Sequence, residues 1–255
     1  MMSYRCEALW VNTSASLQRF DQPLLQYLAT SVGIARWAYR QTPDEPSDLE
    51  IPVQLLHEYL QQQDRPMHLV GHGTSGLVAL LVARQFPEYV RSLTLLGVGY
   101  QASLDWIAHY YFHLKFLDCC REQIFYQLVT DLFGRQNPAR HCYFRQILEQ
   151  ALATSPSPHS MIQTATVPKG GVSVPLMACR GTDDVVVDSL EIEGWREWLK
   201  ESDRIYHCPH GRHFFHSTHP QLVGHQILDF WNEVSLNTTL SWLEIAPALA
   251  IKGRH

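Results

Sequence analysis

The sequence predicts an α/β fold, in which a mostly parallel sheet is flanked by helices and carries an inserted helical cap. Short apolar runs alternate with helical segments along most of the 255 residues. The runs are continuously apolar rather than alternately apolar and polar, which is typical of parallel strands covered on both faces. Because this length suits one sizeable domain, we expect residues 1–255 to form a single domain.

The first hundred residues carry the beginning of this alternation. Apolar runs predict strands over 4–14, 32–39, from 67 onward and over 92–98. Apolar residues at helical spacing predict helices over 20–28, 49–63 and 77–83. Asp21-Gln22-Pro23 is typical of a helix start, so we expect the first helix to begin there.

The alternation is broken between residues 101 and about 168, where we expect the helical cap. A long helical stretch over 104–133, in one or two helices, is rich in aromatic residues. Gly134 and Pro138 interrupt it, and another helix is expected over 142–152. The aromatic residues suit either an apolar substrate pocket or packing of the cap on the body, and packing is the commoner role at this spacing.

The alternation resumes in the last third of the chain. Strands are expected over 174–180 and 204–208, and helices near 194–200 and over 220–231. The tail from about 235 carries no motif.

Four segments of the chain resemble the α/β-hydrolase superfamily, and in particular its small, lid-bearing esterases and lipases. They occur in the order of the family and cover its nucleophile, a following strand, its acid and its base; they are 68–76 (HLVGHGTSG), 87–97 (PEYVRSLTLLG), 180–184 (RGTDD) and 211–216 (GRHFFH). The likeness extends from about residue 5 to 232, apart from the cap. It implies the α/β-hydrolase fold.

The resemblance also assigns catalytic positions. The family's turn Gly-x-Ser-x-Gly corresponds to 71–75, so the nucleophile position is occupied by Gly73, which has no side chain. The acid corresponds to Asp184, with Asp183 as the fallback, and the base to His213. Gly-Thr-Asp-Asp is also a good turn sequence, which is a structural reason for the same residues. Since the turn needs a positive φ, glycine at 73 should relieve strain and leave the fold intact.

The oxyanion hole is expected to use backbone N–H groups on either side of this turn. One donor would be Thr74, and the other would lie after the first strand, near Thr13 or Ser14. Many members of the family carry His-Gly at that strand end, whereas this chain has Asn12-Thr13-Ser14. His72 is expected to line the same pocket.

Ser75 is the fallback nucleophile. It occupies a position where the turn needs a small residue, so we expect its hydroxyl to point into the structure rather than toward His213.

Three functions are consistent with these residues. In the first, the chain is non-catalytic or strongly attenuated and binds a small apolar, ester-like ligand or a protein partner, because losing such a nucleophile costs on the order of a million-fold in turnover. In the second, it is a serine ester hydrolase whose Ser is replaced by Gly73 in this chain; the intact Asp184 and His213 favour this hypothesis. In the third, His213 activates water for a hydrolase or lyase reaction without a covalent intermediate.

Composition excludes several other classes. A net charge of -5 without a like-charge block does not favour nucleic acid. No apolar run approaches the roughly 20 residues that span a bilayer, and we see no secretory signal, so we expect a cytoplasmic protein without a transmembrane segment. The six cysteines form no Cys-x-x-Cys pair and are expected to be free, buried thiols.

Neither a metal nor a cofactor is expected. Histidines recur at every third position over 207–219, but this period in a loop does not make ligands converge. His109 and His113 have a spacing that can bind zinc on a helix, yet no third ligand is indicated. The Gly-x-Gly of 71–73 lacks the third glycine and the acidic residue of a dinucleotide-binding loop.

Overall fold

The computed structural model describes residues 6–42, 44–45, 47–159 and 166–251, with the backbone alone for 238–251. It confirms the α/β class. Within these residues the sheet has six strands, all parallel, in the order β2-β1-β3-β4-β5-β6. The strands are β1 (Cys6–Asn12), β2 (Gly33–Ala38), β3 (Met67–His72), β4 (Val90–Leu96), β5 (Leu176–Gly181) and β6 (Arg204–Cys208).

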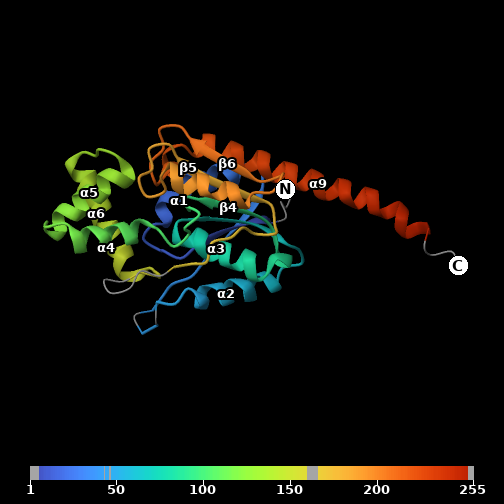
Figure 1. Cartoon of the computed structure of the whole chain (residues 1–255), viewed down its shortest axis with the longest axis horizontal. Helices are drawn as coiled ribbons and strands as arrows, with labels where there is room; N and C mark the ends of the chain where they lie inside the picture. Colours follow the sequence, from blue (N-terminus) through green and yellow to red (C-terminus); the bar gives the residue numbers. More distant parts are fainter. Residues whose placement is uncertain (1–5, 43, 46, 160–165, 252–255) are drawn as a thin grey trace.

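Helices cover both faces of the sheet (Figure 1). Side chains of a strand alternate between faces, so Leu9 and Val11 of β1 join one core while Ala8 and Trp10 join the other. The first core is covered by α2, α3, α7 and the 3-10 helices; these are α2 (Glu50–Gln61), α3 (Thr74–Gln85), η1 (Pro87–Tyr89), α7 (Ser189–Glu193) and η2 (Gly194–Trp198). The second core is covered by α1 (Gln18–Leu28), α8 (Phe215–Thr218) and α9 (Pro220–Ile251).

Three further helices lie between β4 and β5, and Figure 1 shows them gathered at one end of the molecule. They are α4 (Trp106–Phe116), α5 (Arg121–Phe133) and α6 (Pro138–Thr154), and we call them the helical insertion. Gly134 ends α5 with a φ of +79°, and the Asn137 side chain caps α6, whose first residue is Pro138. The interruptions expected at 134 and 138 therefore have a backbone cause.

Several element boundaries differ from the sequence prediction. α1 begins at Gln18, upstream of Asp21-Gln22-Pro23, because burying Phe20 outweighs the cost of a proline inside the helix. The segment near 194–200 is the 3-10 helix η2, which follows the short helix α7. The helix expected over 220–231 continues to Ile251, into the tail for which no motif was found.

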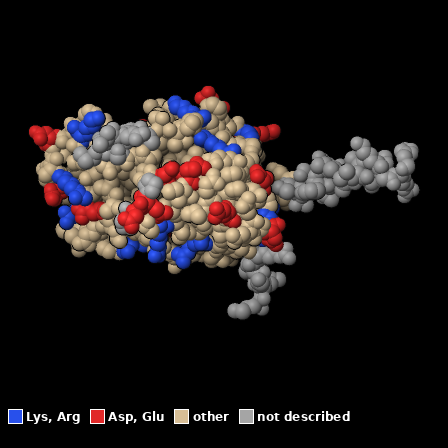
Figure 2. Space-filling view, turned by 90° about the horizontal axis from the view of Figure 1, so that it is seen from below, with Lys and Arg blue, Asp and Glu red and all other residues tan. Residues whose placement is uncertain are grey.

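Charged residues of both signs are interspersed over the face seen in Figure 2, with no continuous block of either sign. Of the helices in the described part of the chain, none combines the length and the apolar character needed to cross a membrane. All six cysteines are free, but only Cys179 and Cys208 are buried, so the expectation of buried thiols is wrong for the others.

His68 on β3 makes stability depend on pH. Its buried ring stacks on Trp231, with 5.0 Å between the ring centroids, and its Nδ1 lies 2.7 Å from the Ser92 hydroxyl. Burial, with smaller effects from Arg91 and Arg65, lowers the pKa of His68 to about 3. Below about pH 6.5 the His68 side chain takes up a proton in the unfolded chain but not in the folded one. The free energy of unfolding therefore decreases by about 1.4 kcal/mol for each pH unit as the pH falls from about 6.5 to about 3.

We expect His68→Asn to remove this contribution. Urea unfolding measures the free energy of unfolding at several pH values between about 6 and 4. Its slope against pH should be smaller for the variant by the equivalent of about one proton, or about 1.4 kcal/mol per pH unit. Between pH 7 and 8 the two slopes should coincide. Equal slopes between pH 6 and 4 would contradict a neutral buried His68.

Candidate active site at the carboxyl edge of the sheet

The residues assigned to catalysis follow four different strands. Thr13 and Ser14 come after β1, Gly73 after β3, Asp184 after β5 and His213 after β6. Because all these strands are parallel, the loops after them meet at one edge of the sheet.

The turn between β3 and α3 has the geometry that the motif predicts. Gly73 has φ +52° and ψ -128°, and a Cβ added to it would meet no atom within 4 Å. In contrast, a Cβ on Gly71 would lie 2.7 Å from the backbone nitrogen of Gly76, and one on Gly76 would lie 2.7 Å from a methyl group of Val98. Strand and helix therefore pack too closely for a side chain at 71 or 76, whereas position 73 has room for one.

Asp184 and His213 form a buried pair. His213 Nδ1 lies 3.1 Å from Asp184 Oδ2, and both side chains are fully buried. The other carboxylate oxygen accepts the backbone N–H groups of Val186 and Val187, at 2.9 and 3.2 Å. Donation from Nδ1 to the carboxylate leaves Nε2 as the acceptor of a neutral imidazole, and Nε2 has no hydrogen-bond partner among the described residues. This is the arrangement that a general base needs.

Asp183 does not take part in this pair. Its side chain is exposed and accepts a hydrogen bond of 3.2 Å from the Thr182 hydroxyl. Of the two candidate acids, the structure therefore brings only Asp184 to His213.

The donors expected after β1 are already engaged. The Thr13 N–H donates to Ser75 Oγ at 2.9 Å, and Thr13 Oγ1 lies 3.0 Å from the same oxygen. The Ser14 N–H donates a hydrogen bond of 3.2 Å to the Asn12 side-chain oxygen. Only the Thr74 N–H, at the start of α3 where helical N–H groups lack intrahelical partners, is left for an oxyanion. The Ser75 hydroxyl is thus bound to Thr13, 62 residues away in sequence.

His72 lies in a cluster of histidine rings. Its ring centroid is 4.7 Å from that of His213 and 4.5 Å from that of His216, and its Nε2–H donates to the His213 carbonyl oxygen at 3.0 Å. Burial, followed by the neighbouring His216 and His213, lowers the pKa of His72 well below its usual value. His72 is therefore neutral at pH 7.

A second buried His–Asp pair escaped the sequence prediction. His216 Nε2 lies 3.1 Å from Asp21 Oδ1. The other oxygen of Asp21 accepts from Trp10 Nε1–H at 3.0 Å and from Asn12 at 3.1 Å. His216 belongs to the series of regularly spaced histidines, but nothing in the sequence relates it to Asp21, 195 residues away.

The helical insertion covers the turn. Trp106 and Ile107 of α4 and Ser155 after α6 help to enclose a cavity of about 30 Å³ above Gly73. A cavity of this size holds one or two water molecules, whereas small-molecule sites are typically about 300–1,000 Å³. His213 does not line it.

His109 of α4 is affected electrostatically by the buried pair. Burial, followed by His213 and His113, lowers the pKa of His109, whereas Asp105 and Asp184 have weaker opposite effects. The sequence indicated only its spacing to His113. Within the part of the chain that is described, no group of three or more His, Cys, Asp or Glu side chains could hold a metal ion.

Thr74 connects the turn to the helical insertion. Its Oγ1–H donates to Asp105 Oδ2 at 2.7 Å, while the other oxygen of Asp105 caps α4 by accepting from Ile107 and Ala108.

We expect Thr74→Val to destabilise the fold by about 2 kcal/mol, because the buried Asp105 carboxylate loses a charge-assisted hydrogen bond. Urea unfolding measures the loss. Thr74→Ser keeps the hydroxyl and should retain most of the stability. If both variants had the same free energy of unfolding as the parent chain, the hydrogen bond between Thr74 and Asp105 would not contribute to stability.

The fold is that of the α/β-hydrolases, with a parallel sheet and a tight turn between β3 and α3. The bromoperoxidase from Bacillus anthracis is 13% identical, with a TM-score of 0.65 and coverage of 90% of this chain and 93% of that one. An extracellular α/β-hydrolase from a Paenibacillus species is 12% identical, with a TM-score of 0.60 and coverage of 88% and 98%. These identities show a common fold alone. No family model matches the chain.

Two curated proteins are similar to this chain over nearly their whole length. The uncharacterized protein alr2406 of Nostoc sp. strain PCC 7120 is 42% identical over 230 residues, or 90% of this chain and 92% of the relative. The uncharacterized protein sll0249 of Synechocystis sp. strain PCC 6803 is 41% identical over 237 residues, covering 91% and 94%. The chain belongs to the family of these two proteins.

Proposed function

We propose that this protein uses the α/β-hydrolase fold for binding rather than for ester hydrolysis, with a small apolar molecule or a protein partner as its ligand. The observation that carries the proposal is that the turn between β3 and α3 offers neither a nucleophile nor a free oxyanion donor from Thr13. Gly73 provides no nucleophile, and Ser75 engages the Thr13 N–H that an oxyanion would need. The cavity of about 30 Å³ above Gly73 is also far smaller than typical small-molecule sites of about 300–1,000 Å³.

A serine ester hydrolase is the second candidate, on one observation. The buried pair of Asp184 and His213 is complete, and position 73 has room for a side chain. In this case the natural protein would carry Ser where this chain has Gly73. Direct attack by water, without a side-chain nucleophile, is less well supported, because His213 does not line the cavity that could hold the water.

Ester turnover tests the proposal directly. We expect this chain to hydrolyse p-nitrophenyl acetate and butyrate no faster than its His213→Ala variant, since both lack a nucleophile. Turnover that is lost in His213→Ala would overturn the proposal and support the mechanism that uses water. A fluorophosphonate probe should leave the chain unlabelled. Labelling of Ser75 would show that its hydroxyl leaves Thr13 and acts as the nucleophile.

A further inference from the structure

We propose that the ligand is an amphipathic anion, an acyl or aryl chain that ends in a carboxylate or phosphate, and that it binds in a cleft away from Gly73. The cleft has a volume of about 480 Å³ and lies between α1, the α5–α6 connection and α8. This inference rests on the proposed binding function and names the class of ligand and the site.

The cleft has a size that suits a small molecule. Typical ligand sites are about 300–1,000 Å³, so 480 Å³ is sufficient, whereas the cavity above Gly73, at about 30 Å³, is not. None of the residues around Gly73 lines the cleft.

The charge of the cleft is positive, although the chain as a whole has a net charge of -5. Arg19, Arg140 and Arg212 line it together with His210 and His219, and its lining contains no acidic residue. Guanidinium groups recognise carboxylate and phosphate with paired hydrogen bonds. A lining of this kind therefore selects an anion over a neutral ester.

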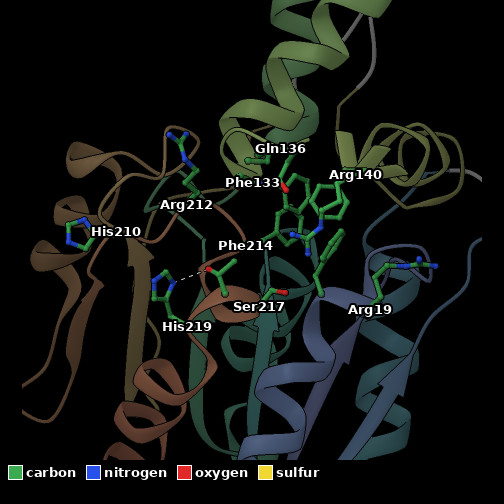
Figure 3. A pocket seen from close by; sticks show the side chains of 13 residues that line it. Arg19, Phe133, Gln136, Arg140, His210, Arg212, Phe214, Ser217 and His219 are labelled. Atoms are coloured by element: carbon green, nitrogen blue, oxygen red, sulfur yellow. Dashed lines mark hydrogen bonds between the residues drawn. The ribbon is translucent and has the colours of Figure 1, made fainter. Parts of the chain in front are cut away.

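Arg140 is the arginine best placed for this role. Figure 3 shows its guanidinium in the middle of the cleft, with Arg19 and Arg212 on either side. Its side chain has no hydrogen bond or ion pair within the described residues, whereas Arg212 donates to the Thr130 and Asp131 carbonyl oxygens at 3.2 and 3.3 Å. Arg19 lies over the ring of Tyr143, at 5.2 Å from its centroid.

The remaining wall of the cleft is apolar and aromatic. Phe133 and Phe214 stack with 4.6 Å between ring centroids and an interplanar angle of 5°, and Phe20 and Phe144 pack beside them. These rings can hold an acyl or aryl chain while an arginine holds the anionic end. Phe214 also contacts His72, at 4.8 Å between ring centroids, so this ring connects the cleft with the cluster of histidine rings.

Calorimetric titration of the full chain tests the inference with probes of equal chain length. Decanoate and monodecyl phosphate, both below their micelle concentrations, carry the anion; decanol and decyltrimethylammonium are the neutral and cationic counterparts. Inorganic phosphate provides the anion without the chain. We expect both amphipathic anions to bind with one site per chain, at least tenfold more tightly than the other three probes.

Variants locate the binding. Arg140→Ala should weaken decanoate or decyl phosphate binding at least tenfold, and Ser217→Glu, which places a negative charge in the lining, should do the same. Arg135→Ala is the matched control, because Arg135 is an exposed arginine of the α5–α6 connection, just before the helix that carries Arg140, and lies outside the lining. Thermal unfolding establishes that each variant is folded.

Three results would overturn the inference: equal binding of decanol and decanoate, equal effects of Arg140→Ala and Arg135→Ala, or no binding of either anion. Each of these leaves the proposed lack of ester hydrolysis untouched, since that is measured separately by turnover. Ester turnover that depends on His213, together with anion binding at Arg140, would instead reject the proposed function but support the cleft as an anion-binding site.

Discussion

Gly73→Ser combined with Ser75→Gly should hydrolyse short p-nitrophenyl esters about 10²–10³-fold faster than Gly73→Ser alone, because one oxyanion donor is worth about this much. Gly73→Ser supplies a hydroxyl at the nucleophile position of the motif, and its Cβ meets no atom within 4 Å. The Thr13 N–H nevertheless stays bound to the Ser75 hydroxyl at 2.9 Å. Ser75→Gly releases that donor and restores Gly-x-Ser-x-Gly.

Three controls accompany the double variant. Ser75→Gly alone should remain inactive, since it has no nucleophile. His213→Ala in the double variant should abolish turnover, and a fluorophosphonate probe should label position 73 only where Ser is present. If Gly73→Ser alone were as active as the double variant, the contact of Ser75 with Thr13 would not limit catalysis. Thermal unfolding must show that the variants compared have similar stability.

Asp21→Ala is expected to destabilise the protein by about 3–5 kcal/mol, the largest loss of stability that we predict. The Asp21 carboxylate accepts hydrogen bonds from Trp10, Asn12 and His216, all of which are buried. Its removal leaves three buried donors without their acceptor. Urea unfolding monitored by circular dichroism measures the loss.

An exposed pair of the same chemistry provides the control. His225 and Asp229 of α9 lie 3.0 Å apart, with side chains that are 65% and 46% exposed. Because solvent screens such a pair, Asp229→Ala should cost no more than about 0.5 kcal/mol. Asp21→Asn keeps an acceptor for part of the network and should fall between the two. Equal losses for Asp21→Ala and Asp229→Ala would contradict a structural role for the buried network.

The fold could be predicted because its signals are local. Apolar runs and helical spacing predicted the succession of strands and helices in the sequence. Strand β6 was predicted at its observed bounds, Arg204–Cys208. The pairing of Asp184 with His213 was implied by the resemblance to the α/β-hydrolases, which carry an acid and a base in the loops after their last two strands. The assignment of catalytic roles to these residues stays a prediction.

Features that depend on distant contacts could not be predicted. Asp21 belongs to a typical helix start, so its sequence gave no sign that its carboxylate serves β1 and α8 rather than the helix backbone. The hydrogen bond between Thr13 and Ser75 requires the loop after β1 and the first turn of α3 to lie side by side, although the two residues are 62 positions apart in sequence. The arginines of the cleft come from α1, α6 and the loop after β6, and no spacing in the sequence relates them.

Relative to Gly-x-Ser-x-Gly, this chain lacks a hydroxyl at 73 and has one at 75. The hydroxyl at 75 consumes the donor that a hydroxyl at 73 would need. The two positions are therefore coupled: a hydroxyl introduced at 73 gains the Thr13 N–H as a donor only when position 75 gives up its own hydroxyl.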